Sequence, residues 1–169
     1  MAVAVFSSEI VKGEVTFSQM GLDVVIVAKF SALPPGDHGF HIHKAGDLRG
    51  EGCQGACDHF TTGSTIHGGP PGSLGGEGKR HTGDLGNIKQ EEEKTYTLSN
   101  LSVEDLWGRS MIVHADPDDL GLGQEEDSKT TGHSGARIGC AVIGRVECAE
   151  KKGGSRKKRD SRKKKCCKH

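Results

Sequence analysis

Short runs of alternating apolar and polar residues dominate the first part of the chain. The clearest run is VKGEVTFS at residues 11–18, in which Val11, Gly13, Val15 and Phe17 alternate with polar or charged residues. A period of two is typical of a β-strand with one face on a core and the other in water. Further runs rich in β-branched residues predict strands at residues 1–6, 24–30, 95–98, 110–114 and 138–146.

Glycine, proline, asparagine and aspartate separate these runs, and no segment has the apolar spacing of a long amphipathic helix. Two stretches, residues 44–87 and 115–136, are too long and too rich in glycine to be simple turns. We expect them to be functional loops without regular structure. Several short strands with turns between them predict an all-β fold, an antiparallel sandwich or barrel.

Composition divides the chain into two parts of opposite charge. Its length of 169 residues suits one domain, and its formal net charge is zero. Residues 1–150, however, hold 12 Lys and Arg against 22 Asp and Glu, whereas residues 151–169 hold 11 against 1. Apart from its cysteines the second part has no apolar residue, so it cannot bury enough surface to fold. We therefore predict one domain over residues 1–150 and a disordered basic tail over residues 151–169.

The location of the protein can be anticipated only in outline. The sequence lacks both a charged segment followed by an apolar signal-like stretch and a run of about 18 apolar residues. We expect an unsecreted, cytoplasmic protein with no transmembrane segment. The tail, Lys151 to His169, could bind a polyanion such as nucleic acid or a glycan, act as a nuclear address, or fold back on the acidic domain.

Histidines form the most informative pattern in the chain. His41 and His43 lie two apart in GFHIH, so on a strand both rings project from one face and could bind one ion. Taken alone, the pair could equally be two surface or core histidines. The other candidates are His59, His67, His81, His114 and the carboxylate Asp84. Six imidazoles exceed the four ligands of one tetrahedral ion, which indicates two metal ions of undecided identity.

The motifs GFHIH, CDHF, HGGP, RHTGDLGNI, MIVHADPDDLG and GHSGARIGCAVIG occur in this order. Together they resemble the Cu/Zn superoxide dismutases over nearly all of residues 1–150. The resemblance implies a Greek-key antiparallel β-sandwich, or flattened barrel, with two long metal-site loops. It also implies antioxidant disproportionation of two superoxide anions to O2 and H2O2, with copper cycling between +2 and +1 and zinc structural. A homodimer and a copper chaperone are the protein partners that it implies.

The resemblance also implies roles for individual residues. Copper would be held by His41, His43, His59 and His114, and zinc by His59, His67, His81 and Asp84. His59 would bridge the two ions and take part in catalysis, and Asp118 would accept hydrogen bonds from His41 and His67. Arg137 would guide the anion, where a surface salt bridge is the simpler alternative, and Thr131 would narrow the channel. His38 would be structural, and His133 and His169 are expected at the surface.

Three further expectations follow from the same motifs. Cys53 and Cys140 match the family's disulfide, although the spacing alone leaves Cys57 as a competitor for Cys140. Trp107, Gly108 and residues 143–146 match regions that meet across a dimer axis, with core packing as the alternative for Trp107. Lys129 lies one position from the usual steering lysine, and Thr130 takes that place.

Two other functions compete with the dismutase. A zinc hydrolase would also use a His-x-His strand with a third histidine, but the linked set of six histidines and Arg137 argue against it. A catalytically silent copper- and zinc-binding domain would be favoured by a missing ligand or arginine, and none is missing.

Overall fold

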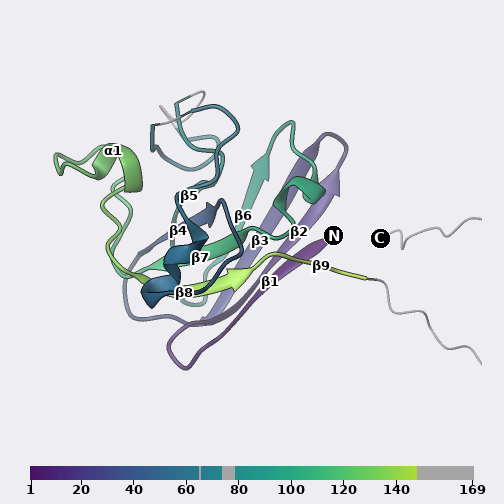
Figure 1. Ribbon diagram of the computed structural model, residues 1–169, viewed down its shortest axis with the longest axis horizontal. Helices are drawn as coiled ribbons and strands as arrows, with labels where there is room; N and C mark the ends of the chain where they lie inside the picture. The colour runs from purple at the N-terminus through teal and green to yellow at the C-terminus, as the bar shows by residue number, and fades with distance from the viewer. Residues whose placement is uncertain (65, 74–78, 148–169) are drawn as a thin grey trace, which may run out of the picture.

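The computed structural model describes residues 1–64, 66–73 and 79–147, and within them the chain forms two antiparallel sheets (Figure 1). The five-stranded sheet, in the order β6-β3-β2-β1-β9, contains β1 (Ala2–Ser7), β2 (Lys12–Met20), β3 (Asp23–Ala32), β6 (Glu93–Leu98) and β9 (Gly144–Arg145). The four-stranded sheet, in the order β5-β4-β7-β8, contains β4 (His38–His43), β5 (Asp84–Ile88), β7 (Ser110–His114) and β8 (Arg137–Val142). The predicted all-β sandwich is confirmed.

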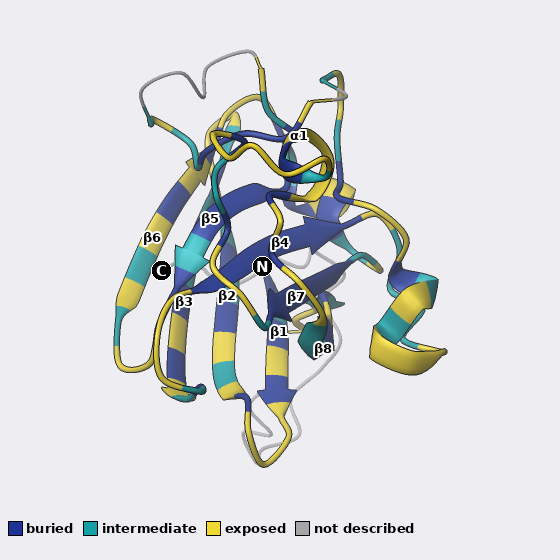
Figure 2. Cartoon of the chain, turned by 90° about the vertical axis from the view of Figure 1, so that its left-hand side faces the viewer, coloured by how far each residue is buried: buried dark blue, intermediate teal, exposed yellow. Residues whose placement is uncertain are grey.

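The alternation seen in the sequence reappears as alternating burial in the five-stranded sheet (Figure 2). In β2, Val15 and Phe17 are fully buried, while the residues between and beside them remain partly accessible. β3 follows the same pattern with Val24, Ile26, Ala28 and Phe30 in the core. One face of this sheet therefore packs inward, and the other lies in water.

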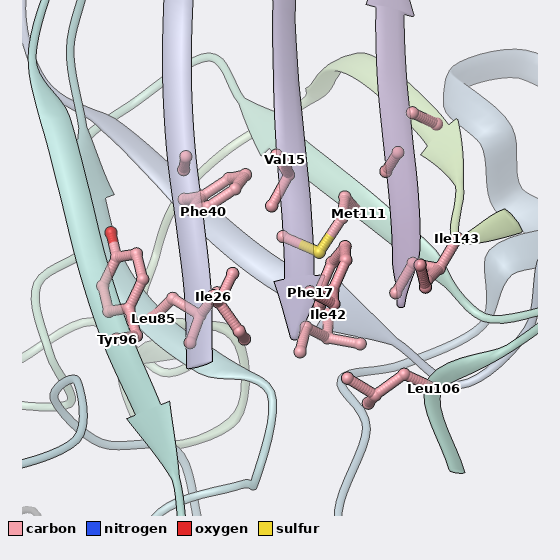
Figure 3. Packing of buried hydrophobic residues seen from close by; sticks show 14 of the residues in the cluster. Val15, Phe17, Ile26, Phe40, Ile42, Leu85, Tyr96, Leu106, Met111 and Ile143 are labelled. Carbon is pink, nitrogen blue, oxygen red and sulfur yellow. The ribbon is translucent and has the colours of Figure 1, made fainter. Parts of the chain in front are cut away.

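The core lies between the two sheets (Figure 3). Phe17 and Ile26 from the five-stranded sheet face Phe40, Ile42 and Met111 from the four-stranded sheet, and all are fully buried. Aromatic rings also meet across the layers, since Phe30 and Phe40 lie edge to face with centroids 5.7 Å apart. This packing fixes β4 with one face on the core, which decides where its other face points.

Two predictions about the strands were wrong in detail. Residues 138–146 do not form one strand, because the chain leaves β8 after Val142 and joins the other sheet as β9, with Ile143 buried between them. Neither long stretch is free of regular structure. Residues 44–87 contain the 3-10 helix η1 (Glu51–Ala56) and most of β5, and residues 115–136 contain the short helix α1 (Ser128–Thr131). Gly86, at φ 71°, interrupts the alternation of β5, so only pairing with β4 reveals the strand.

Connections that cross between the sheets give the Greek-key arrangement. The chain passes from β3 to β4, returns from β5 to β6, and crosses again from β6 through the 3-10 helix η2 (Val103–Leu106) to β7. Both long loops join strands of the four-stranded sheet, β4 to β5 and β7 to β8, and the second contains the short helix α1 (Ser128–Thr131) (Figure 1). Among the described residues, no helix has the length and apolar character needed to span a membrane.

Candidate metal centre

The site begins with the face of β4 that points away from the core. Phe40 and Ile42 lie in the core, so strand alternation places His41 and His43 on the opposite face, where the two long loops cover them. β7 pairs with β4 and ends at His114, whose ring centroid lies 4.9 Å from that of His41 and 5.8 Å from that of His43. Two neighbouring strands thus bring three histidines together.

His59 completes this group from the first long loop. It forms an isolated bridge with His43, and its ring centroid lies 4.0 Å from that of His41. The four histidines His41, His43, His59 and His114 can each place one ring nitrogen within 4.8 Å of the others. All four are buried.

Three of these rings share one arrangement, in which one ring nitrogen bonds to the protein and the other does not. One nitrogen of each is held by the protein: His41 Nε2 by Asp118 at 2.9 Å, His43 Nδ1 by the Cys57 carbonyl at 2.7 Å, and His114 Nδ1 by the Gly135 carbonyl at 3.1 Å. The other nitrogens, His41 Nδ1, His43 Nε2 and His114 Nε2, are buried and have no hydrogen-bond partner in the described part of the chain. Buried polar atoms without partners are costly. A metal ion would satisfy all three, so these residues fit one.

A second group forms around Asp84 at the start of β5. Its Oδ1 lies 2.8 Å from His59 Nδ1, 3.0 Å from His67 Nδ1 and 3.3 Å from His81 Nδ1. In a tetrahedral site with bonds of about 2.0–2.1 Å, ligand atoms lie about 3.3–3.4 Å apart. Asp84 Oδ2 accepts hydrogen bonds from the backbone N–H groups of Gly68 and His81, which orients the carboxylate. Three imidazoles and one carboxylate are a donor set suited to zinc.

The two groups differ in their electrostatics. Burial, reinforced by neighbouring His59, lowers the pKa of His41 and of His43, and burial lowers that of His114 to about 4. These rings are therefore neutral at pH 7, with lone pairs available. Burial alone would also lower the pKa of His67, but its hydrogen bond to Asp118 and the nearby Asp84 carboxylate raise it to about 9. The second group thus contains a negatively charged carboxylate, Asp84, whereas the first group consists of neutral imidazoles.

Asp118, in the second long loop, connects the two groups. Its Oδ2 accepts a hydrogen bond from His41 Nε2 at 2.9 Å, and its Oδ1 accepts one from His67 Nε2 at 2.8 Å and one from the Leu120 N–H at 2.7 Å. Asn87 holds the loop in place, because its side chain exchanges two hydrogen bonds with the Asp118 backbone. Sequence reasoning identified Asp118 but missed Asn87, whose only signal was its place in the motif RHTGDLGNI.

A cavity of about 650 Å³ opens beside the first group, and His43, His59 and His114 form part of its wall. Arg137 and Thr131 line the same cavity. The Arg137 guanidinium donates hydrogen bonds to the carbonyls of Cys53 at 2.8 Å and Cys57 at 2.6 Å. Within the ranges that the structure describes, no carboxylate lies within ion-pair distance of Arg137, which argues against the salt-bridge alternative.

A disulfide joins Cys53 of η1 to Cys140 of β8, and Cys57 is a free, exposed cysteine. The pairing chosen from the motif is therefore confirmed. The bond ties the first long loop to the strand that begins with Arg137. Both carbonyls that hold the guanidinium thus belong to a covalently anchored segment.

A family model for copper/zinc superoxide dismutase matches residues 11–143. The chain belongs to this family. It is 44% identical over 151 residues to the Cu-Zn superoxide dismutase of Paramecium bursaria Chlorella virus 1, covering 85% of this chain and 77% of the relative. The crystal structure of the clock protein EA4 is similar with a TM-score of 0.73 and 35% identity, over 85% of this chain and 92% of that one. The protein is accordingly an enzyme of the superoxide dismutase class, and its cofactors are copper and zinc.

Other residues of this dismutase occupy less central positions. His38 is buried, and its two ring nitrogens contact the carbonyls of His114 and Pro34, in keeping with a structural role. Lys129 donates a hydrogen bond to the Gly121 carbonyl and lies outside the cavity lining, whereas Thr130 is part of that lining. The tail, residues 151–169, together with Cys148, Cys166, Cys167 and His169, falls outside the described residues.

Proposed function

We propose that the protein removes superoxide in antioxidant defence by disproportionating two superoxide anions to O2 and H2O2. The observation that carries the proposal is the set of three buried, unpartnered ring nitrogens beside a cavity lined by Arg137. Copper bound there supplies a one-electron centre that cycles between +2 and +1. Its ligands would be His41, His43, His59 and His114.

The second group would hold zinc in a structural role, since zinc has no redox chemistry. Its ligands would be His59, His67, His81 and Asp84. His59 belongs to both groups, and its Nδ1 faces Asp84, which leaves Nε2 for the copper group. Because His59 also lines the cavity, we assign it a catalytic role: its Nε2 would hold the proton that the product peroxide needs.

Arg137 would attract and orient the substrate. Its guanidinium carries a charge that does not titrate under physiological conditions, and two carbonyls fix its direction. With no carboxylate partner in the described ranges, this charge is available to an anion in the cavity. Thr131, also in the lining, would narrow the approach.

A second copy of this chain is the expected protein partner. Val142 and Val146 expose 41% and 39% of their surface near β9, and the Arg145 guanidinium lies 5.1 Å from the centre of the Trp107 ring. Trp107 is half-buried against the core, so its packing accounts for only part of its surface. Because this end of the sandwich holds the residues that match the dimer regions of the family, we infer that it forms a homodimer contact.

The burial of the copper group and the charge of the tail bear on how the enzyme is loaded and where it resides. The four-histidine group is buried beneath the loops, which is consistent with loading by a copper chaperone rather than from free ions. The basic tail, Lys151 to His169, would hold the enzyme near a polyanion, a nucleic acid or a glycan, in the cytoplasm or the nucleus. Its sequence charge, not its structure, supports this assignment.

The test is superoxide removal by the copper- and zinc-loaded protein at about 0.01 M and 0.15 M salt, with metal content measured on the same sample. Arg137→Ala should lower the rate about tenfold at low salt, because steering by charge contributes about 10–10³ in such enzymes. Arg49→Ala is the matched control, since Arg49 is exposed, pairs with Asp47 and lies outside the cavity lining. A copper-filled protein that leaves superoxide untouched would instead be a silent metal-binding domain, and zinc-dependent hydrolysis without copper would indicate a hydrolase.

A further inference from the structure

His133 lies two residues beyond the end of α1, in the second long loop. Its backbone has a φ of 49°, in the left-handed region where asparagine, aspartate and histidine are the most frequent residues after glycine. Its side chain is 56% exposed, and its Nδ1 lies 2.7 Å from Asp127 Oδ1. The ring is therefore held at the surface by a single carboxylate.

That carboxylate belongs to the cavity. Asp127 is part of the cavity lining, and its second oxygen, Oδ2, accepts a hydrogen bond from the Thr131 hydroxyl at 3.0 Å. The Asp127 carbonyl also accepts hydrogen bonds from the hydroxyls of Thr130 and Thr131. Asp127 thus links the surface imidazole to two threonines that line the substrate's approach.

The permanent charges of the lining reveal what this link does. The lining contains two cations, Lys44 and Arg137, and two carboxylates, Asp58 and Asp127. Lys44 Nζ lies 3.1 Å from Asp58 Oδ2, so this pair largely cancels. Arg137 and Asp127 remain, with opposite charges, and the carboxylate weakens the attraction that the guanidinium exerts on an incoming anion.

We propose that His133 is a positioning residue for anion access, whose imidazolium neutralises Asp127 and so leaves Arg137 as the charge that superoxide meets. This inference rests on the proposed function and assigns a new residue to it. The role depends on the geometry of the pair at the rim, because His133 itself does not line the cavity.

The charge of the ring makes the device sensitive to pH. The hydrogen bond to Asp127, together with the nearby charges of Asp127, Glu125 and Asp119, raises the pKa of His133 above its ordinary value. The imidazolium is therefore present below that raised pKa and is lost as the pH rises through it. Above it, Asp127 stands uncompensated at the rim. A unit charge about 10 Å from the path of an anion changes the local anion concentration about twofold in a water-like medium.

The experiment compares His133→Asn with the wild-type holoenzyme. Asparagine tolerates the left-handed backbone and can donate a hydrogen bond to Asp127, but it carries no charge. Superoxide removal is measured from pH 6 to 9 at about 0.01 M salt, where charges act over about 30 Å. The wild type should lose about half of its rate as His133 titrates, and the step should vanish at high salt. His133→Asn should show no step and should remain at the lower rate.

Two further variants locate the effect. Asp127→Asn should be faster than the wild type throughout, since the opposing carboxylate is gone, and its step should move to lower pH, because His133 loses the partner that raises its pKa. Glu126→Gln is the matched control: it removes a neighbouring carboxylate for which the structure shows no bond to His133, so the step should persist. The pKa of His133, read by NMR on the reduced holoprotein, should fall in Asp127→Asn.

The inference and the proposed function can fail separately. Azide, a small singly charged anion, serves as a probe whose affinity for the copper-loaded protein does not depend on turnover. If azide affinity and superoxide removal keep the same pH step in His133→Asn as in the wild type, His133 has no part in anion access. If the wild type removes no superoxide but its azide affinity shows a step that His133→Asn abolishes, the proposed function fails and the inference stands.

Discussion

Replacing Asp118 by asparagine tests how the two metal groups are coupled. In the wild type, three N–H donors, from His41, His67 and Leu120, bond the two carboxylate oxygens of Asp118. Asparagine has nearly the same shape but offers only one acceptor oxygen to these three donors. The amide N–H2 of asparagine would face one imidazole N–H, donor against donor. One buried ring would therefore lose its partner.

Both rings also lose a charged acceptor, so the ring whose position is fixed less firmly by its backbone is affected more. His41 lies in β4, held by pairing with β5 on one side and β7 on the other, so its position does not depend on Asp118. His67 lies in the first long loop and is oriented by side-chain contacts to Asp118 and Asp84. We therefore expect the loss to fall on the zinc group. A lost hydrogen bond to a buried group costs about 1–3 kcal/mol, and loss of such an orienting partner typically weakens metal binding about 10–100-fold.

Zinc affinity would be measured by competition with a chromophoric chelator on Asp118→Asn and on Asp119→Asn. Asp119 is the neighbouring carboxylate, and it bonds the Gly121 N–H rather than a histidine, so its loss controls for the change in net charge. The expected result is 10–100-fold weaker zinc binding for Asp118→Asn and little change for Asp119→Asn. Unchanged zinc affinity, or a loss confined to copper, would refute the reasoning about the loop and the strand.

Three further changes probe the fold around the site. Cys140→Ser removes a cross-link between residues 87 positions apart, and the chain-entropy model assigns such a bond about 4–5 kcal/mol of stability. The unfolding temperature of the variant should therefore fall by as much as that of the wild type falls when reductant is added. Equal stability with and without the bond would contradict this. Gly132→Ala should cost at least about 1–2 kcal/mol in urea unfolding, because φ is 70° there and the added Cβ would meet the Asp118 carboxylate; a neutral effect would mean that the loop is not packed as described. Phe17→Ala should lower the free energy of unfolding by about 3–5 kcal/mol, measured by denaturant titration, since Phe17 is fully buried between the sheets. Phe17→Leu should lower it clearly less, and equal losses in the two variants would contradict the packing.

Much of the fold could be predicted because the signal is local. The alternation of Val15 and Phe17 with polar residues reports one buried face, and the structure places that face on the core. Where alternation is interrupted, prediction failed. Gly86 hides β5, and buried Ile143 made β8 and β9 look like one strand although they belong to different sheets. In both cases hydrogen bonding to a distant strand decides the structure.

The candidate ligands could also be chosen from the sequence, because histidines are infrequent in the chain and occur in an ordered set of motifs that resembles a metalloenzyme family. The contacts that the surrounding loop residues make were not predictable. Lys129 turns to the Gly121 carbonyl, while Lys44 enters the cavity lining. His133 looked like an ordinary surface residue until the loop placed it on Asp127.

The sequence by itself thus determined the strand-rich class, the difference in charge between residues 1–150 and 151–169, and the identity of the metal-binding candidates. Each of these depends on residue type and near-neighbour spacing. Only the tertiary structure decided how Asn87 holds the loop that carries Asp118, the direction of Arg137 and the balance of charge at the rim. Hydrogen bonds and ion pairs act over a few ångströms, so they depend on how loops far apart in the chain fold over one sheet.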